Sequence, residues 1–190
     1  GDYLQAFDQL YRSNGIYWFD AATVAERVLT VDELKHYVDA HVPAPAPLSE
    51  QELENLASEP PAAKLRALLG RRLMRAERYE EAPGYFSNGD VQNKAKAYSQ
   101  QRQEAQAAWW PTTRAAALFN SAWMARDWGM DIIGYEMAPD YATFGGNYSL
   151  ETALPTVGAL MSEDEVQRHQ ASAARPDQRF HYRYVANSLA

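Results

Sequence analysis

The chain has 190 residues, of which 46% are hydrophobic and 23% are charged, a balance that is typical of a folded domain and excludes general disorder. Its 25 acidic residues outnumber its 18 basic ones, and the resulting net charge of −7 argues against nucleic-acid binding, because phosphates require a positive surface. Cysteine is absent, which excludes disulfides and thiolate metal sites. No run of ~18 apolar residues is present, so the sequence predicts no membrane span. Composition leaves the cellular compartment undetermined.

Residues 1–42 are predicted to form three helices, which we interpret as the end of a preceding repeat pair. Side chains that can cap these helices precede each of them: Asp2, Asp20 and Thr30, the last in a capping box with Glu33. Residues 43–48 alternate proline with other residues and are predicted to form an extended connector.

Segment 49–129 carries the most informative pattern in the chain. Leu69 and Leu73 are predicted to pack a first helix, and a tight turn then leads into a second helix rich in aromatic residues. The residues of this pattern are Leu69, Gly70, Leu73, Tyr79, Ala82, Tyr85 and Phe86. Over residues 63–96 their order and spacing resemble a tetratricopeptide repeat (TPR), a helix–turn–helix unit whose small residues let its two helices approach closely.

The resemblance implies an all-α fold, in which TPR-like helical hairpins stack as an α-solenoid with one long irregular loop. By the same resemblance, the concave face of the stack binds a peptide or a partner protein, without cofactor and without catalytic turnover. Arg66 and Gly89 depart from the family pattern, which favours a large apolar residue and an alanine at these positions. Two long helices are predicted to follow, from Asp90 to Trp109 and from Pro111 to Gly129.

The second of these helices resembles the first helix of another, degenerate unit. Small alanines alternate with large side chains along it, and Phe119 and Trp123 are predicted to belong to its dense apolar packing face.

A cluster of arginines lies in the predicted first helix of the repeat and in the turn that follows it: Arg66, Arg71, Arg72, Arg75 and Arg78. Acidic residues stand beside the cluster at positions 77, 80 and 81. We therefore predict that these arginines form the solvated face of one helix rather than a phosphate-binding surface.

The helical periodicity of the sequence stops at Met130, and residues 130–161 are predicted to form a long irregular loop. This loop is a candidate binding element. The candidate ligand-binding residues are Tyr135, Glu136, Asp140, Tyr141, Phe144, Asn147 and Tyr148. Their rings would form a platform, and their polar groups would give directional hydrogen bonds to a sugar or a peptide. In the alternative interpretation, the same aromatics only plug the groove between helix pairs.

The sequence contains no motif for nucleophilic catalysis, phosphate binding or metal binding. Glu136 and Asp140 are the first candidates for a glycosidase carboxylate pair, although a separation of four residues in a loop determines no geometry. Tryptophans on which sugars can stack are present at positions 18, 109, 110, 123 and 128. The histidines at positions 36, 41, 169 and 181 form no pair at helical ligand spacing. We predict no enzyme activity, no metal and no cofactor.

Residues 162–190 are predicted to form two C-terminal helices. The helix after Ser162 is polar on most faces and is expected to form an outer layer. The last helix carries an apolar stripe of Phe180, Tyr184, Val185 and Leu189. No cap or breaker ends it, from which we expect a segment truncated from a longer array.

The sequence therefore favours a non-catalytic protein- or peptide-interaction module of a larger helical-repeat protein. One alternative is a carbohydrate-binding or glycan-processing domain that uses the 135–148 loop on a helical scaffold. A third possibility is a spacer between other domains of the parent chain.

Overall fold

The computed structural model describes residues 2–44, 59–137, 162–172 and 182–190, and within these ranges every regular element is helical. In chain order the elements are α1 (Tyr3–Tyr11), α2 (Trp18–Arg27), α3 (Val31–His41), α5 (Pro61–Arg75), the 3-10 helix η1 (Ala82–Tyr85), α6 (Gly89–Ala107), α7 (Pro111–Ile132), α9 (Glu163–Ser172) and α10 (Tyr182–Leu189). The described part of the chain is thus all-α, as predicted, whereas the solenoid arrangement stays a prediction. None of the described helices is both long enough and apolar enough to cross a bilayer.

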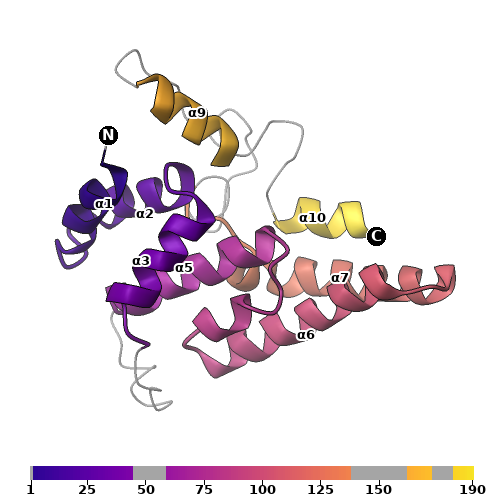
Figure 1. Cartoon of the computed structure of the whole chain (residues 1–190). Helices are drawn as coiled ribbons and strands as arrows, with labels where there is room; N and C mark the ends of the chain where they lie inside the picture. The colour runs from indigo at the N-terminus through magenta and orange to yellow at the C-terminus, as the bar shows by residue number, and fades with distance from the viewer. Residues whose placement is uncertain (1, 45–58, 138–161, 173–181) are drawn as a thin grey trace.

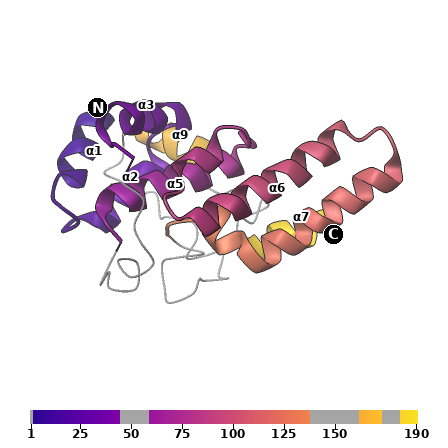
Figure 2. The same ribbon diagram turned by 90° about the horizontal axis from the view of Figure 1, so that it is seen from below.

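The described helices occupy two regions (Figure 1). Helices α1, α2, α3 and α5 gather at one end, with α9 packed beside α2. Helices α6 and α7 run side by side in opposite directions and form a long hairpin that extends away from α1, α2 and α3 (Figures 1 and 2). Helix α10 lies along α7. The turn between α6 and α7 is therefore the outer tip of the hairpin, at the opposite end from α1.

Helix α5 is the centre of the hydrophobic core, because it packs against α2, α3, α7 and η1. Pro61 occupies its first turn, where the missing amide donor costs nothing. The side chains that it buries completely recur along one side of the helix: Leu65, Leu68, Leu69 and Leu73. Burial of such a side chain contributes about 1.5–3 kcal/mol relative to exposure, so α5 anchors the surrounding helices.

Two helix starts follow the capping signals in the sequence. The Asp2 carboxylate accepts a hydrogen bond from the Gln5 amide at 3.0 Å. The capping box of Thr30 and Glu33 is complete, since each side chain accepts from the backbone amide of the other residue.

Two other helix starts differ from the prediction. Helix α2 begins at Trp18, so Asp20 lies in its first turn instead of capping it, a position where a carboxylate still interacts favourably with the helix dipole. Asn88, rather than Asp90, caps α6, because its side-chain oxygen accepts from the amides of Asp90 and Val91.

The predicted second helix of the repeat is wrong in form, since η1 is a single 3-10 turn and the next α-helix begins only at Gly89. Pro83 has no amide donor and Gly84 disfavours helix by about 1 kcal/mol, so the segment does not propagate. Its residues are nevertheless buried: Tyr79, Ala82, Tyr85 and Phe86. Phe86 packs so closely on α5 that a Cβ added at Gly70 would lie 2.9 Å from the Cζ atom of the ring.

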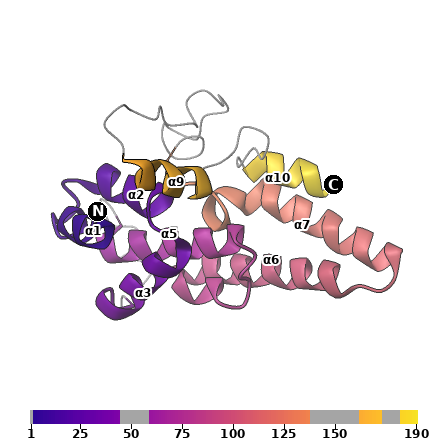
Figure 3. The same cartoon turned by 45° about the horizontal axis from the view of Figure 1, so that its top comes forward.

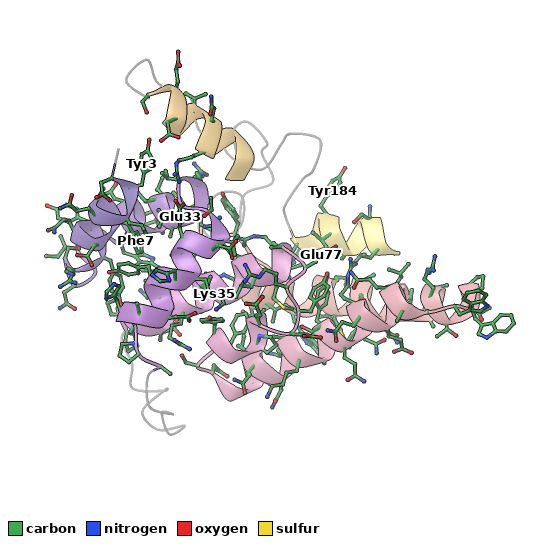
Figure 4. The ribbon with its side chains drawn as sticks, in the orientation of Figure 1. Tyr3, Phe7, Glu33, Lys35, Glu77 and Tyr184 are labelled. Atoms are coloured by element: carbon green, nitrogen blue, oxygen red, sulfur yellow. The ribbon has the colours of Figure 1, made fainter. Side chains whose placement is uncertain are left out.

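The predicted stripe on the last helix is also wrong in part. Tyr182 and Ala186 are the buried residues of α10, and Gly129 of α7 lies directly against Tyr182. Tyr184 is 40% exposed and points away from α7 (Figure 4). Phe180 lies outside the described residues.

Most of the predicted connector and the predicted irregular loop fall outside the described ranges, at residues 45–58 and 138–161. The domain boundaries proposed at 43–48 and 130–161 therefore stay predictions.

Candidate interaction surface

Of the seven predicted ligand-binding residues, only Tyr135 and Glu136 are described. The other five lie outside the described residues: Asp140, Tyr141, Phe144, Asn147 and Tyr148. The Tyr135 side chain is buried, and the guanidinium carbons of Arg75 and Arg27 lie 4.9 and 5.8 Å from the centre of its ring. A ring enclosed in this way packs the interior, as the alternative interpretation expects of a plug.

The Glu136 carboxylate ties the chain after α7 to the first half of the molecule. It accepts a hydrogen bond from Trp18 Nε1 at 3.0 Å and forms an ion pair with Arg71. Burial raises the pKa of Glu136, and the nearby charge of Arg71 and the hydrogen bond from Trp18 oppose this rise. Both groups that hold Glu136 come from distant parts of the sequence.

Glu26 is the second carboxylate of this region, and its side chain is fully buried. It pairs with Arg75 at 2.5 Å and also accepts a hydrogen bond from the backbone amide of Glu136 at 3.0 Å. Arg72 lies beside it and donates to the backbone carbonyls of Ala25 and Leu29. We refer to Glu26, Arg71, Arg72, Arg75 and Glu136 as the glutamate–arginine cluster.

The prediction that the arginines form a solvated helix face is therefore wrong for three of the five. Arg71 and Arg72 are buried, and only 13% of the Arg75 side chain is exposed. The reason is that Glu26 and Glu136, which are remote in sequence, supply the counter-charges that make burial possible. The cluster joins α2, α5 and the end of α7, and its carboxylates are engaged in holding them.

Four exposed large apolar side chains of the described residues instead lie on the α6–α7 hairpin. Trp109 and Trp110 stand at its tip, with 88% and 69% of their surface exposed. Phe119 and Trp123 lie on the same side of α7, four residues apart, and are 64% and 49% exposed. We refer to these four residues as the hairpin aromatic surface.

The turn that carries the two tryptophans has a defined geometry. Helix α6 ends at Ala107, and Pro111 opens α7 at its first helical position. The Arg114 guanidinium reaches back and donates to the carbonyl of Ala108 at 3.1 Å, which closes the turn. Trp109 and Trp110 therefore project from an ordered end of the hairpin.

Along α7 small residues occupy most of the buried positions, whereas the aromatics Phe119 and Trp123 are exposed. The buried positions are Ala117, Ser121, Ala122, Ala125, Gly129 and Ile132. Small side chains allow α6 and α10 to approach closely, but they leave Phe119 and Trp123 without a described partner helix. Contiguous exposed apolar residues of this size are typical of interaction sites.

The hairpin aromatic surface also has a distinct charge pattern. Residues 105–126 contain neither aspartate nor glutamate, although the whole chain has 25 acidic residues. The charged residues in that run are Arg114 and Arg126, and 71% of the Arg126 side chain is exposed. The surface thus combines aromatics with arginines, the residue types enriched at the energetic centres of protein interfaces.

A second exposed apolar patch lies at the other end of the described molecule, in the turn between α1 and α2 and the first turn of α2. It comprises Ile16, Tyr17 and Phe19. Asn14 and Gly15 form this turn with φ angles of 55° and 89°, in the left-handed region that favours these residue types.

No family model, curated protein or solved structure matches this chain. Among the described residues, no group of three or more histidine or acidic side chains is placed to hold a metal ion.

Sequence reasoning missed this surface because it assigned Phe119 and Trp123 to the packing face of their helix. Two signals were present in the sequence: the absence of acidic residues over 105–126, and the pair Trp109–Trp110 directly before a helix-starting proline. Neither signal says by itself which side of α7 is covered, since aromatics and alanines occur on several of its faces.

Proposed function

We propose that this chain is a non-catalytic protein-interaction module on a helical scaffold, and that the hairpin aromatic surface is its contact site. The observation that carries the proposal is the exposure of Trp109, Trp110, Phe119 and Trp123 on one hairpin. Exposed aromatics of this kind provide most of the binding energy in many interfaces once a partner excludes water from them.

The resemblance to a TPR draws support from the close approach of α5 and the segment that follows it, but not from the form of that segment, which is a single 3-10 turn. Gly70 has no side chain where the Phe86 ring lies, which is the use of a small residue that the resemblance implies. The carbohydrate-binding alternative draws no support from Tyr135 and Glu136, because a buried ring and a carboxylate paired with Arg71 are not available to a sugar.

The proposal is tested by finding a partner and then measuring its affinity. A photo-crosslinking amino acid at position 119 would capture the partner from an extract of the source organism, and the purified partner would then be titrated by calorimetry. We expect Phe119→Ala/Trp123→Ala to weaken binding by ~tenfold or more, as truncation of central interface aromatics does.

The matched control truncates the other apolar patch. Tyr17→Ala/Phe19→Ala removes exposed aromatics of similar size at the opposite end and should leave the affinity within ~twofold, as expected outside an interface centre. Circular dichroism should show unchanged helicity in both variants. Equal affinities for the wild type and both double variants would refute the proposal.

A further inference from the structure

We infer that the partner presents an acidic amphipathic helix, which packs on the outer part of α7 next to α10. This inference rests on the proposed function, and it specifies the chemistry of the partner. Three features of the described residues support it: the seat of α10 on α7, the exposed residues beyond that seat, and the charges around them.

The packing of α10 on α7 shows how α7 accommodates another helix. Tyr182, the first residue of α10, lies against Gly129, and α10 runs from there toward the hairpin tip, antiparallel to α7 (Figures 1 and 3). Its eight residues span only about 12 Å, because a helix rises 1.5 Å per residue. The outer part of α7 therefore extends past the end of α10 (Figure 3).

The helix face that seats α10 continues along the uncovered part of α7. Ala125, Ala122, Leu118 and Ala115 follow Gly129 at spacings of three and four residues, so they share its face. Burial declines along this row: Ala125 and Ala122 are buried, Leu118 is half-buried and Ala115 is exposed. Phe119 and Trp123 border the same row. A second helix placed in line with α10 would cover Leu118, Ala115 and Phe119, and its near end would border Trp123, which lies about 9 Å along α7 from Gly129.

The charges of the surface select the kind of helix. On α7 the cations are Arg114 and Arg126, and the nearest acid is Asp127, directly after the acid-free run. Asp127 forms an ion pair with Arg126 at 3.5 Å, but 71% of the Arg126 side chain is exposed, and exposed pairs of this kind are weak enough for a partner carboxylate to compete. On the facing part of α6, Arg102 is engaged with Glu77 and Tyr79, and Glu104 accepts a hydrogen bond from Gln101. Aspartate and glutamate on the flanks of the partner helix would therefore meet arginines. A second copy of this surface would bring arginine toward arginine, which disfavours self-association.

The test uses three synthetic peptides of about 18 residues, long enough to populate helix in isolation. All carry one leucine stripe at helical spacing, and their flanking positions are glutamate in the first, lysine in the second and glutamine in the third. Binding to the full chain is measured by fluorescence anisotropy at low and at high salt. We expect the glutamate peptide to bind ~tenfold more tightly than the lysine peptide at low salt, and less so at high salt.

Two variants separate the apolar from the ionic part of the surface. Arg114→Gln/Arg126→Gln should lower the preference for glutamate over lysine by ~threefold or more while binding of the glutamine peptide persists. Phe119→Ala/Trp123→Ala should weaken all three peptides. Tyr17→Ala/Phe19→Ala serves again as the control and should change none of them.

Equal or stronger binding of the lysine peptide would overturn the inference, and so would absence of binding by any peptide. Dimerisation of the chain that Phe119→Ala/Trp123→Ala abolishes would replace the acidic helix by a second copy. A purified partner that contacts position 119 through a basic or non-helical segment would refute this inference and leave the proposed function intact. A partner whose affinity does not depend on Phe119 and Trp123 would refute both.

Discussion

Gly70 illustrates how a single residue sets the distance between two segments of this chain. Its position in the middle of α5 carries a helix-propensity cost of about 1 kcal/mol relative to alanine. That cost is offset because the Phe86 ring occupies the space of a side chain, with ring atoms at 2.9, 3.0 and 3.3 Å from a Cβ built there. The ring is 4% exposed, so it has little room to move.

We therefore expect Gly70→Val to lower the free energy of unfolding by about 1–3 kcal/mol, the usual cost of an overpacked core. Urea denaturation followed by circular dichroism measures this change. Gly89→Ala is the matched control, since nothing lies within 4 Å of its added Cβ, and it should be neutral or slightly stabilising. A Gly70→Val variant as stable as the wild type would contradict the packing of Phe86 on α5.

Residue identity alone predicted some environments and failed for others. Leu69 and Leu73 were predicted to lie in the core, because leucines four residues apart share one face of a helix. The burial of Arg71 and Arg72 was not predictable, since it depends on carboxylates at positions 26 and 136 that the sequence does not mark as neighbours. An isolated arginine belongs in solvent, and only tertiary pairing reverses that preference.

At the scale of the element, α9 is attached to the rest of the molecule by Arg168. Its guanidinium donates to both carboxylate oxygens of Glu33 on α3, at 3.1 and 2.9 Å, and lies 4.7 Å from the centre of the Tyr3 ring. Figure 4 shows Tyr3 and Glu33 on the side of the molecule that α9 covers. Burial favours a higher pKa for Glu33, but hydrogen bonds from Arg168 and Thr30 outweigh it and lower the pKa below the ordinary 4.5.

A lowered carboxylate pKa stabilises the attachment of α9 above pH ~4.5, and this contribution is lost as the pH falls through the lower, folded-state value. Arg168→Gln should therefore loosen α9 at neutral pH and weaken the pH dependence of its attachment. Hydrogen exchange of residues 163–172 measures both effects. Arg126→Gln, at an exposed arginine on α7, is the control. Unchanged exchange in Arg168→Gln would show that other contacts hold α9.

Helix α10 depends in the same way on a single small residue of α7. A Cβ added at Gly129 would lie 2.5 Å from the Tyr182 Cβ and 2.8 Å from its Cδ2, and a Cβ cannot swing aside as the end of a side chain does. Gly129→Val should therefore displace α10 and speed hydrogen exchange over residues 182–190. Gly84→Ala, with nothing within 4 Å of the new Cβ, should leave that exchange unchanged. Slow exchange of α10 in Gly129→Val would contradict the packing of Tyr182 on Gly129.

Among the elements, those with strong local signals were predictable. Asp2 and the capping box of Thr30 and Glu33 mark helix starts that the structure retains. The 3-10 turn at Pro83 was not predicted, because the local sequence does not distinguish a proline in the first turn of a helix from a proline that ends a helix. The outward face of α7 was missed because the positions of α6 and α10 decide which of its apolar faces is covered, and these positions are tertiary information.

At the scale of the whole molecule, the glutamate–arginine cluster connects regions that are far apart in the chain. The Glu26 carboxylate of α2 binds Arg75 of α5 and the amide of Glu136 after α7. Arg75 in turn donates to the carbonyls of Ile133 and Gly134, at 3.2 and 2.6 Å. The N-terminal helices and the inner end of the hairpin are thus attached to each other through one buried ionic network, and the orientation of the hairpin depends on it.

Glu26→Gln tests this dependence, because it removes the charge and keeps the shape of the side chain. Loss of one partner leaves the buried Arg72 and Arg75 without compensation, so we expect the free energy of unfolding to fall by about 3–5 kcal/mol. Lys94→Gln, which breaks the exposed pair with Asp90, should cost only about 0.3–0.5 kcal/mol. Hydrogen exchange should rise together in α2 and in residues 132–136, since the same carboxylate holds both. A rise confined to α2, or a cost as small as that of the control, would mean that the two regions are joined by their apolar contacts alone.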